Sequence, residues 1–161
     1  MKAIVDTTKF QRFDSLQQEA FLNLWRTYDR LRSIEDALFS RYDLTAQQYN
    51  ALRILRSARP EMLPTLSLAS RLISRAPDIT RLLDKLHERG LIERLRSPDN
   101  RRVVKVGITP DGLDLLKKLT VEVEACHAQQ LGHLNSAHLR QLIELLRKGR
   151  EPHESPESNW I

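Results

Sequence analysis

The sequence predicts a mainly helical protein that carries one small β-hairpin. Three observations support this fold class. Apolar residues recur at intervals of three, four and seven over most of the 161 residues, which is the spacing of amphipathic helices. Two short segments, 92–96 and 103–108, instead favour strands, and the second alternates apolar residues with other types. The sequence Ser-Pro-Asp-Asn between them is typical of a turn.

Composition and charge restrict the class of protein. Hydrophobic residues make up 40% and charged residues 29%, as in ordinary globular domains, and the formal net charge of +5 favours an acidic partner such as nucleic acid. No stretch of eighteen apolar residues and no signal peptide are present, and the single cysteine precludes an internal disulfide. We therefore expect one domain in the cytoplasm, with no membrane partner.

The first long helix is predicted over residues 14–41, after an irregular arm at 1–13. Its apolar positions form two adjacent stripes, which is broader than one neighbouring helix covers. The first stripe contains Leu16, Ala20, Leu24, Leu31 and Leu38, and the second contains Phe21, Trp25 and Tyr28. The helix is therefore expected either to be deeply buried or to contact another subunit.

Two shorter helices follow. Thr45 and Gln48 match the capping box, in which both side chains bond the start of a helix, so a helix is predicted from Thr45 to about Ala58. Pro60 and Pro64 indicate a loop, and a third helix is expected after Thr65.

The fourth helix is predicted within residues 74–89, with one apolar seam formed by Ile79, Leu82, Leu83 and Leu86. Two starts are compatible with Pro77: Ser74 as the N-cap, or Ala76 as a poor N-cap with Pro77 first in the helix. We prefer Ser74. At the other end, Gly90 can adopt the left-handed backbone conformation that ends many helices. Leu91 is then expected to make a hydrophobic contact with Leu86, as in a Schellman ending.

The chain is expected to end in two further helices. Thr109 and Pro110 indicate an N-cap and a first helical residue, and this helix extends to about Leu131. The last helix follows Ser136 and is expected to stop at Gly149, with a disordered tail at 149–161. Four helices, a hairpin and two helices make a winged helix-turn-helix with long flanking helices.

This arrangement predicts DNA binding. A helix in the major groove buries one face and presents another to base edges and phosphates, mainly through its first turns. The candidate recognition-helix residues are Ser74, Arg75, Ala76, Pro77, Asp78, Thr80, Arg81 and Lys85. Arginine can bond guanine in a bidentate manner, and Asp78 can either accept from a cytosine amino group or orient Arg75 or Arg81.

The hairpin supplies a second basic surface. Arginine on a protruding wing can enter a narrow minor groove, where the negative potential is strongest. The candidate wing residues are Arg96, Asn100, Arg101, Arg102 and Lys105.

Three segments resemble the MarR family of bacterial transcriptional regulators. LTAQQYNALRIL (44–55) is similar to the family's second helix, SRAPDITRLLDKLHERGLIER (74–94) to its recognition helix, and NRRVVKVGITPDG (100–112) to its wing. Asn100 stands where the family has an aspartate that orients the wing arginine, here Arg102, so either Asn100 or the preceding Asp99 is expected to take that role. Ile108 replaces a leucine of the family's pattern.

The resemblance implies a homodimer that binds a pseudo-palindromic operator in double-stranded DNA, as a repressor, with recognition helices about 34–36 Å apart. It implies dimerisation through residues 14–43 and 110–148, DNA binding through 44–109, and release of DNA on binding a small phenolic or anionic ligand. The apolar residues expected at the dimer interface are Leu115, Leu116, Leu119, Leu139, Leu142 and Leu146.

Other functions are disfavoured. The chain has no phosphate-binding loop or nucleophile elbow, so we expect no enzyme and no cofactor. Cys126, His127, His133 and His138 match no zinc-site spacing, and we expect no metal. For Cys126, a small packed residue is favoured over a redox sensor. A winged-helix module for protein–protein assembly remains the alternative function.

Overall fold

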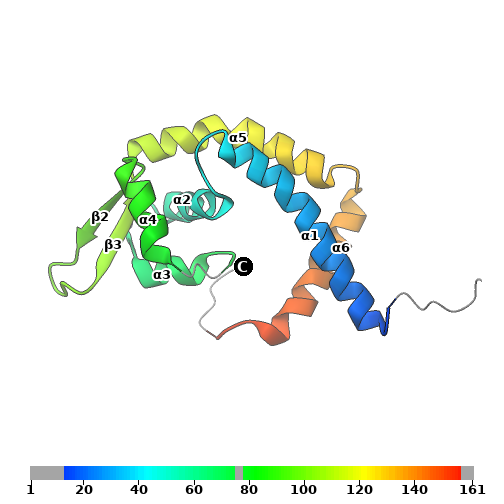
Figure 1. Cartoon of the computed structure of the whole chain (residues 1–161). Coiled ribbons are helices and arrows are strands. Elements are labelled where there is room, and N and C mark those ends of the chain that lie inside the picture. The colour runs from blue at the N-terminus through cyan, green and yellow to red at the C-terminus, as the bar shows by residue number, and fades with distance from the viewer. Residues whose placement is uncertain (1–12, 75–77, 157–161) are drawn as a thin grey trace, which may run out of the picture.

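The computed structural model describes residues 13–74 and 78–156. It confirms the predicted order of four helices, two strands and two helices, and adds a short first strand and a final 3₁₀ turn (Figure 1). The elements are α1 (Leu16–Ser40), α2 (Ala46–Ala58), β1 (Leu63–Pro64), α3 (Thr65–Arg71), α4 (Ile79–Glu88), β2 (Ile92–Arg96), β3 (Val104–Ile108), α5 (Pro110–Leu131), α6 (Ser136–Arg150) and η1 (Glu151–His153).

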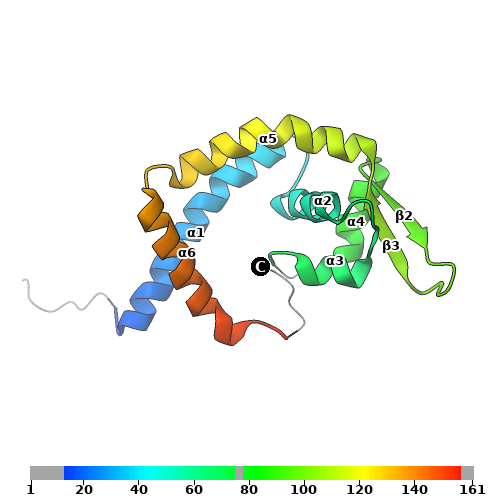
Figure 2. The same cartoon turned by 180° about the vertical axis from the view of Figure 1, so that it is seen from behind.

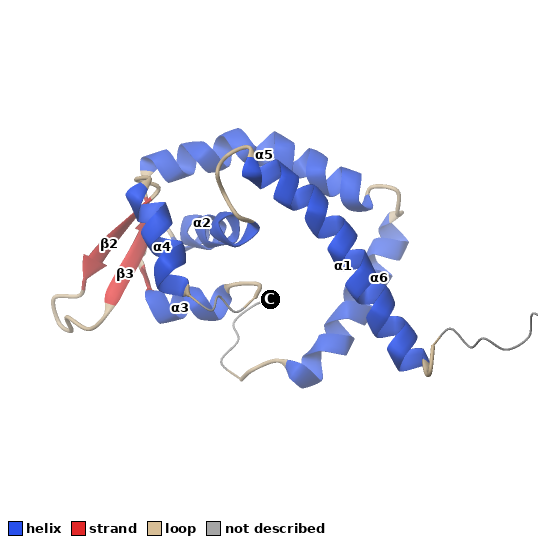
Figure 3. Ribbon diagram, viewed as in Figure 1, coloured by secondary structure: helices blue, strands red, loops and turns tan. Residues whose placement is uncertain are grey.

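The helices divide into two groups that α5 connects. Figures 1 and 2 show α5 running along one side, with α2, α3, α4 and the sheet near its first half and α1 and α6 toward its far end. Coloured by secondary structure, β2 and β3 project beyond the helices as a ribbon (Figure 3). The architecture therefore places the hairpin and α4 together, away from α6.

One core joins the end of α1 to α2, α3, α4, the sheet and α5, along which it extends as far as Cys126. Its largest fully buried side chains are Phe39, Leu52, Leu55, Leu68, Leu83, Leu86, Ile92, Val106, Leu116 and Leu119. The expectation that Leu116 and Leu119 lie at a dimer interface is wrong, because both are used in the core of the protomer itself.

The sheet has three antiparallel strands in the order β1-β3-β2. Leu63 pairs with Val106, and the Thr65 hydroxyl donates to the Val104 carbonyl at 3.2 Å, which fastens the start of α3 to β3. We did not predict β1. Two residues, one of them a proline, are too short to show the alternation that identifies a strand.

Much of α1 has no partner among the described residues. Leu38 and Phe39 are buried, but Leu16 is 81% exposed and Trp25 61% exposed. Deep burial within the protomer is therefore excluded for the first half of the helix, and α6 holds no buried residue either. None of the described helices has the length and apolar character needed to cross a bilayer.

The last helix extends further than expected. It begins after Asn135, whose side chain accepts from the His138 N–H at 2.8 Å, and passes through Gly149 to Arg150. The 3₁₀ turn of η1 follows, so the prediction of disorder is wrong for residues 149–153. A glycine inside a helix costs only about 1 kcal/mol, which neighbouring helical residues offset. Most of the predicted arm (1–12) and the end of the tail (157–161) lie outside the described residues.

Candidate nucleic-acid interface

Helix α4 begins at Ile79 rather than near Ser74. The Asp78 carboxylate is its N-cap and accepts the backbone N–H of Arg81 at 2.9 Å. The preferred N-cap, Ser74, is therefore wrong. A helix that began after Ser74 would need Ala76 in a helical conformation, and the ring of the following Pro77 disfavours that conformation. The Asp78 carboxylate, which we predicted to bond a cytosine amino group or to orient Arg75 or Arg81, thus meets Arg81 at its backbone N–H.

The far end of α4 has the predicted Schellman ending. Gly90 has a φ of +68°, its N–H donates to the His87 carbonyl at 2.9 Å, and the Leu91 N–H donates to the Leu86 carbonyl at 3.0 Å. Leu91 is buried. Both ends of the helix are thus fixed by specific hydrogen bonds, which sets its direction.

The two faces of α4 differ as the sequence predicts. Leu82, Leu83 and Leu86 are buried, and Ile79 is half-buried. Thr80, Arg81 and Lys85 are exposed on the other side. The remaining candidates at the start of this segment, Arg75, Ala76 and Pro77, lie outside the described residues.

Ser74 is exposed, and its hydroxyl accepts from the Gln47 side-chain amide on α2 at 2.8 Å. The neighbouring Ile73 N–H donates to the Asn50 side-chain oxygen, also on α2, at 3.2 Å. Nothing in the local sequence pattern indicates these contacts, because they join residues more than twenty positions apart.

The wing is a regular ribbon with a compact tip. Its five residue pairs extend from Ile92–Ile108 to Arg96–Val104. In the tip, the Ser97 N–H donates to the Val103 carbonyl, and the Asn100 side-chain oxygen accepts the N–H of Arg102 at 3.1 Å. Asn100 therefore shapes the backbone at the position where the family carries an aspartate.

The basic wing residues are exposed but do not all point the same way. Arg101 and Arg102 are at the tip. Lys105 is opposite Leu95, whereas Arg96 is opposite Val104. Because directly paired residues share a face and successive residues alternate, Arg96 and Lys105 project from opposite faces of the ribbon.

An ion pair that we did not predict joins the wing to α4. Arg94 on β2 donates from Nη1 to the Asp84 carboxylate at 2.6 Å, and its Nη2 is 3.4 Å from the Thr80 carbonyl. The recognition-helix and wing candidates consequently belong to one connected surface.

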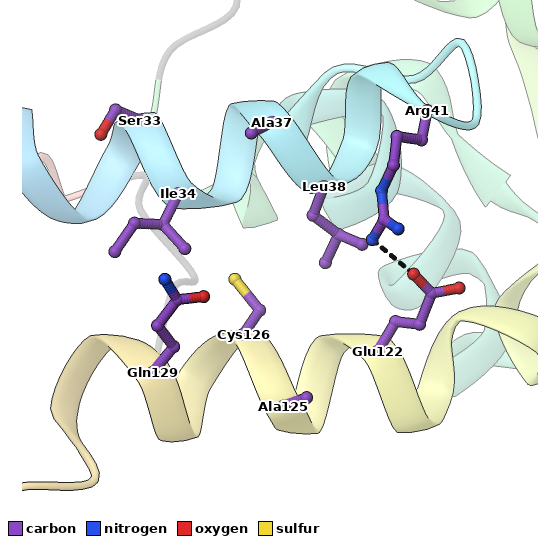
Figure 4. A pocket seen from close by; sticks show the side chains of 9 residues that line it. All are labelled: Ser33, Ile34, Ala37, Leu38, Arg41, Glu122, Ala125, Cys126 and Gln129. Carbon is purple, nitrogen blue, oxygen red and sulfur yellow. Dashed lines mark hydrogen bonds and ion pairs between the residues drawn. The ribbon is translucent and has the colours of Figure 1, made fainter.

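A separate open pocket of about 690 Å³ lies between α1 and α5 (Figure 4). Its lining includes the apolar side chains Ile34 and Leu38 and an ion pair at 2.5 Å between Arg41 and Glu122. Tyr42 also donates its hydroxyl to Glu122.

Cys126 lines the same pocket but is buried, and burial, aided by the negative charge of Glu35, raises the pKa of its thiol. This environment favours the packed residue over the redox sensor, since the reactive form is the thiolate. No cluster of metal-ligating side chains occurs in the described part of the chain.

A polar helix face with capped ends, connected to a basic β-ribbon, defines a winged helix-turn-helix protein. The comparisons with known proteins give the family. The sequence model of the MarR family matches residues 44–104. A solved MarR transcription factor from Planctomyces limnophilus is 57% identical, with a TM-score of 0.68 over 84% of this chain and 98% of its own.

Two further relatives are more distant. Bordetella bronchiseptica BpsR, solved in a study of the regulation of its DNA binding by 6-hydroxynicotinic acid, is 25% identical, with a TM-score of 0.74 over 83% of this chain and 94% of its own. The homoprotocatechuate degradative operon repressor of Escherichia coli is 27% identical over 68% of this chain and 72% of that repressor. The chain belongs to the MarR family, whose members are DNA-binding transcription regulators and not enzymes.

Proposed function

We propose that the chain is a homodimeric repressor that binds a pseudo-palindromic operator and releases it when a small phenolic or other anionic ligand binds. In each protomer, residues 44–109 form the DNA-binding region, and residues 14–43 and 110–148 form the dimerisation region. The observation that carries the proposal is the connection of the exposed face of α4 to the wing through Arg94 and Asp84.

The recognition helix reads bases in the major groove. The candidate residues 74–78, Thr80, Arg81 and Lys85 lie at or before its first turns, where such helices contact base edges. Arg81 and Lys85 are exposed and four residues apart, so they follow one side of α4. A bidentate arginine–guanine contact discriminates against the wrong base by about 1–3 kcal/mol.

The wing contributes affinity. Arg101 and Arg102 at its tip enter the minor groove, and Asn100 holds the tip backbone through the Arg102 N–H. Arg96 and Lys105, on opposite faces of the ribbon, contact phosphates on different sides of the wing.

The homodimer accounts for the exposed apolar surface on the long helices. Leu16, Phe21, Leu24 and Trp25 on α1 are exposed, as are Ile143 and Leu146 on α6. Large apolar side chains that gather on an exposed helix face are typical of a protein–protein contact. Leu139 and Leu142 on α6, which are half-buried, extend this surface, whereas Leu115 packs against the core of the protomer.

The repressor role and the ligand rest on the relatives. The E. coli relative is named a repressor of a degradative operon, and the BpsR study concerns an aromatic hydroxy acid. The pocket between α1 and α5 offers the matching chemistry, because an anion there can compete with Glu122 for Arg41.

Selection of bound duplexes from a random DNA pool tests the proposal. We expect an inverted repeat with half-site centres about 10 base pairs apart, and loss of its enrichment when 6-hydroxynicotinic acid is added as the ligand. Arg81→Ala should change the preferred bases, whereas Lys117→Ala, which removes an exposed charge on α5, should not. If no sequence is enriched by the wild type, the chain is better explained as a protein–protein assembly module.

A further inference from the structure

Two amide side chains on α2 hold the chain just before the proposed DNA-reading segment. Gln47 Nε2 donates to the Ser74 hydroxyl at 2.8 Å, and Asn50 Oδ1 accepts the Ile73 N–H at 3.2 Å. Gln47 and Asn50 are three residues apart, so they occupy the same face of α2. That face is therefore directed at residues 73 and 74.

The connection between α3 and α4 departs from the core at this point. Leu72 is buried with an extended backbone, whereas Ile73 is 65% exposed and Ser74 is also exposed. Apolar packing thus ends at Leu72. The two hydrogen bonds to α2 fix the position of the next two residues.

The other end of the connection is fixed by α4 itself, through the Asp78 carboxylate and the Arg81 N–H. The residues on either side of 75–77 are therefore both held in place: Ser74 is bonded to α2, and Asp78 caps α4. A shift of α2 relative to Ile73 and Ser74 would change the position of Ser74 with respect to Arg81.

We propose that Gln47 and Asn50 are positioning residues for base recognition, which act through Ser74 and Ile73 rather than by contacting DNA. This inference rests on the proposed function. Neither amide carries a charge, so neither contributes the electrostatic attraction to phosphate that acts on every sequence alike. Their effect is therefore on the discrimination between operator and altered operator.

A double-mutant cycle tests the route through Ser74. The affinities of Gln47→Ala, Ser74→Ala and the double variant are measured by fluorescence anisotropy for the selected operator and for duplexes with single-base changes. Each single variant should lower the operator preference about three- to tenfold, the size expected for one hydrogen bond. The double variant should lose no more than either single variant, because both remove the same bond.

Asn50 offers a second, independent comparison. Asn50→Ala should reduce the operator preference to a similar extent, since the Ile73 N–H loses its acceptor. Asn50→Asp keeps an acceptor oxygen but adds a negative charge, so it should retain the preference while weakening binding to all duplexes alike. Ser57→Ala is the control on the same helix, because the Ser57 hydroxyl bonds only its own helix at the Arg53 carbonyl among the described residues.

Three results would overturn the inference. The first is an unchanged preference in Gln47→Ala and Asn50→Ala. The second is a loss of affinity in Gln47→Ala or Asn50→Ala that is equal for all duplexes, which a merely destabilised protein would show; thermal unfolding of each variant identifies this case. The third is additivity of Gln47→Ala and Ser74→Ala, which would place Gln47 on the DNA. If the wild type itself shows no sequence preference, the proposed function fails first, and this inference fails with it.

Discussion

Arg94 on β2 forms an ion pair with Asp84 on α4, with 2.6 Å between Nη1 and the carboxylate. The Arg94 side chain is only 24% exposed, and its Nε is buried without a hydrogen-bond partner among the described residues. The two residues are ten positions apart in the sequence, and their ion pair connects both parts of the proposed DNA-binding surface, the wing and the recognition helix. The wing and the recognition helix are therefore expected to move as one unit.

Removing either member of this pair should destabilise the fold. Asp84→Ala is expected to lower the free energy of unfolding by about 1 kcal/mol, because the half-buried Arg94 guanidinium loses its charged partner. Denaturant unfolding at fixed protein concentration measures the change. Glu88→Ala, an exposed carboxylate one turn later on α4, should change the stability by less than about 0.5 kcal/mol. Strict additivity of Asp84→Ala with Arg94→Ala would contradict a direct interaction.

The two arginines at the wing tip should determine the salt dependence of DNA binding. Arg101→Ala and Arg102→Ala are each expected to reduce the slope of log affinity against log salt by about one unit, because each lost phosphate or minor-groove contact releases fewer counterions. Titrations at several salt concentrations measure this slope. Lys118→Ala, an exposed charge on α5, should leave the slope unchanged; an equal reduction there would mean that the wing has no special role.

Two glycines with open space around them should respond in opposite directions to the same substitution. Apart from the adjacent residues and, for Gly149, the backbone of its own helix, no heavy atom lies within 4 Å of a Cβ placed on Gly90 or Gly149, so neither change creates a clash. Gly90→Ala places a side chain at a φ of +68° and should cost about 1 kcal/mol of stability. Gly149→Ala, inside α6, should add about 0.5–1 kcal/mol. Chemical unfolding of both variants measures the two changes in the free energy of unfolding. A loss of stability in both variants would show that the end of α6 is not helical.

The Glu35 carboxyl on α1 should make stability depend on pH. Burial raises its pKa above the ordinary 4.5, the Asp36 charge acts in the same direction, and His127 opposes both. The folded protein therefore holds the Glu35 proton more tightly than the unfolded chain does. This contribution to stability is complete below pH 4.5 and is lost as the pH rises through the higher folded-state pKa.

Glu35→Gln, which mimics the protonated carboxyl, should consequently be more stable than the wild type at neutral pH, with the difference vanishing below the ordinary pKa. Unfolding curves across this pH range provide the measurement. Glu124→Gln, which alters an exposed carboxylate on α5, is the control. A variant that is less stable than the wild type at neutral pH would show that the Glu35 charge is stabilising.

The sequence was most informative where a single local signal fixes the backbone. Thr45 with Gln48, Thr109 with Pro110, and Gly90 each mark a helix end, and all three predictions are confirmed. Each signal depends only on residues within one helical turn. The start of α4 was harder to predict, because Ser74 and Asp78 are both good capping residues and only the effect of Pro77 on the preceding residue distinguishes them.

Features that depend on distant contacts could not be predicted from local patterns. Helical periodicity marks Leu116 and Leu119 as apolar and directed inward, but it does not distinguish the core of the protomer from a partner subunit. The contacts of Arg94 with Asp84 and of Gln47 with Ser74 likewise follow from the packing of separate elements. Strand β1 consists of two residues, too few for any periodicity.

The central claim is that two protomers each place α4 in a major groove and a wing in the adjacent minor groove. Hydroxyl-radical footprinting on the selected operator tests it most directly. The account predicts a two-fold symmetric pattern with the two centres of protection about 10 base pairs apart, and with outer minor-groove protections that disappear in Arg101→Ala/Arg102→Ala. A single asymmetric patch of protection, or outer protections that persist in that variant, would contradict the account.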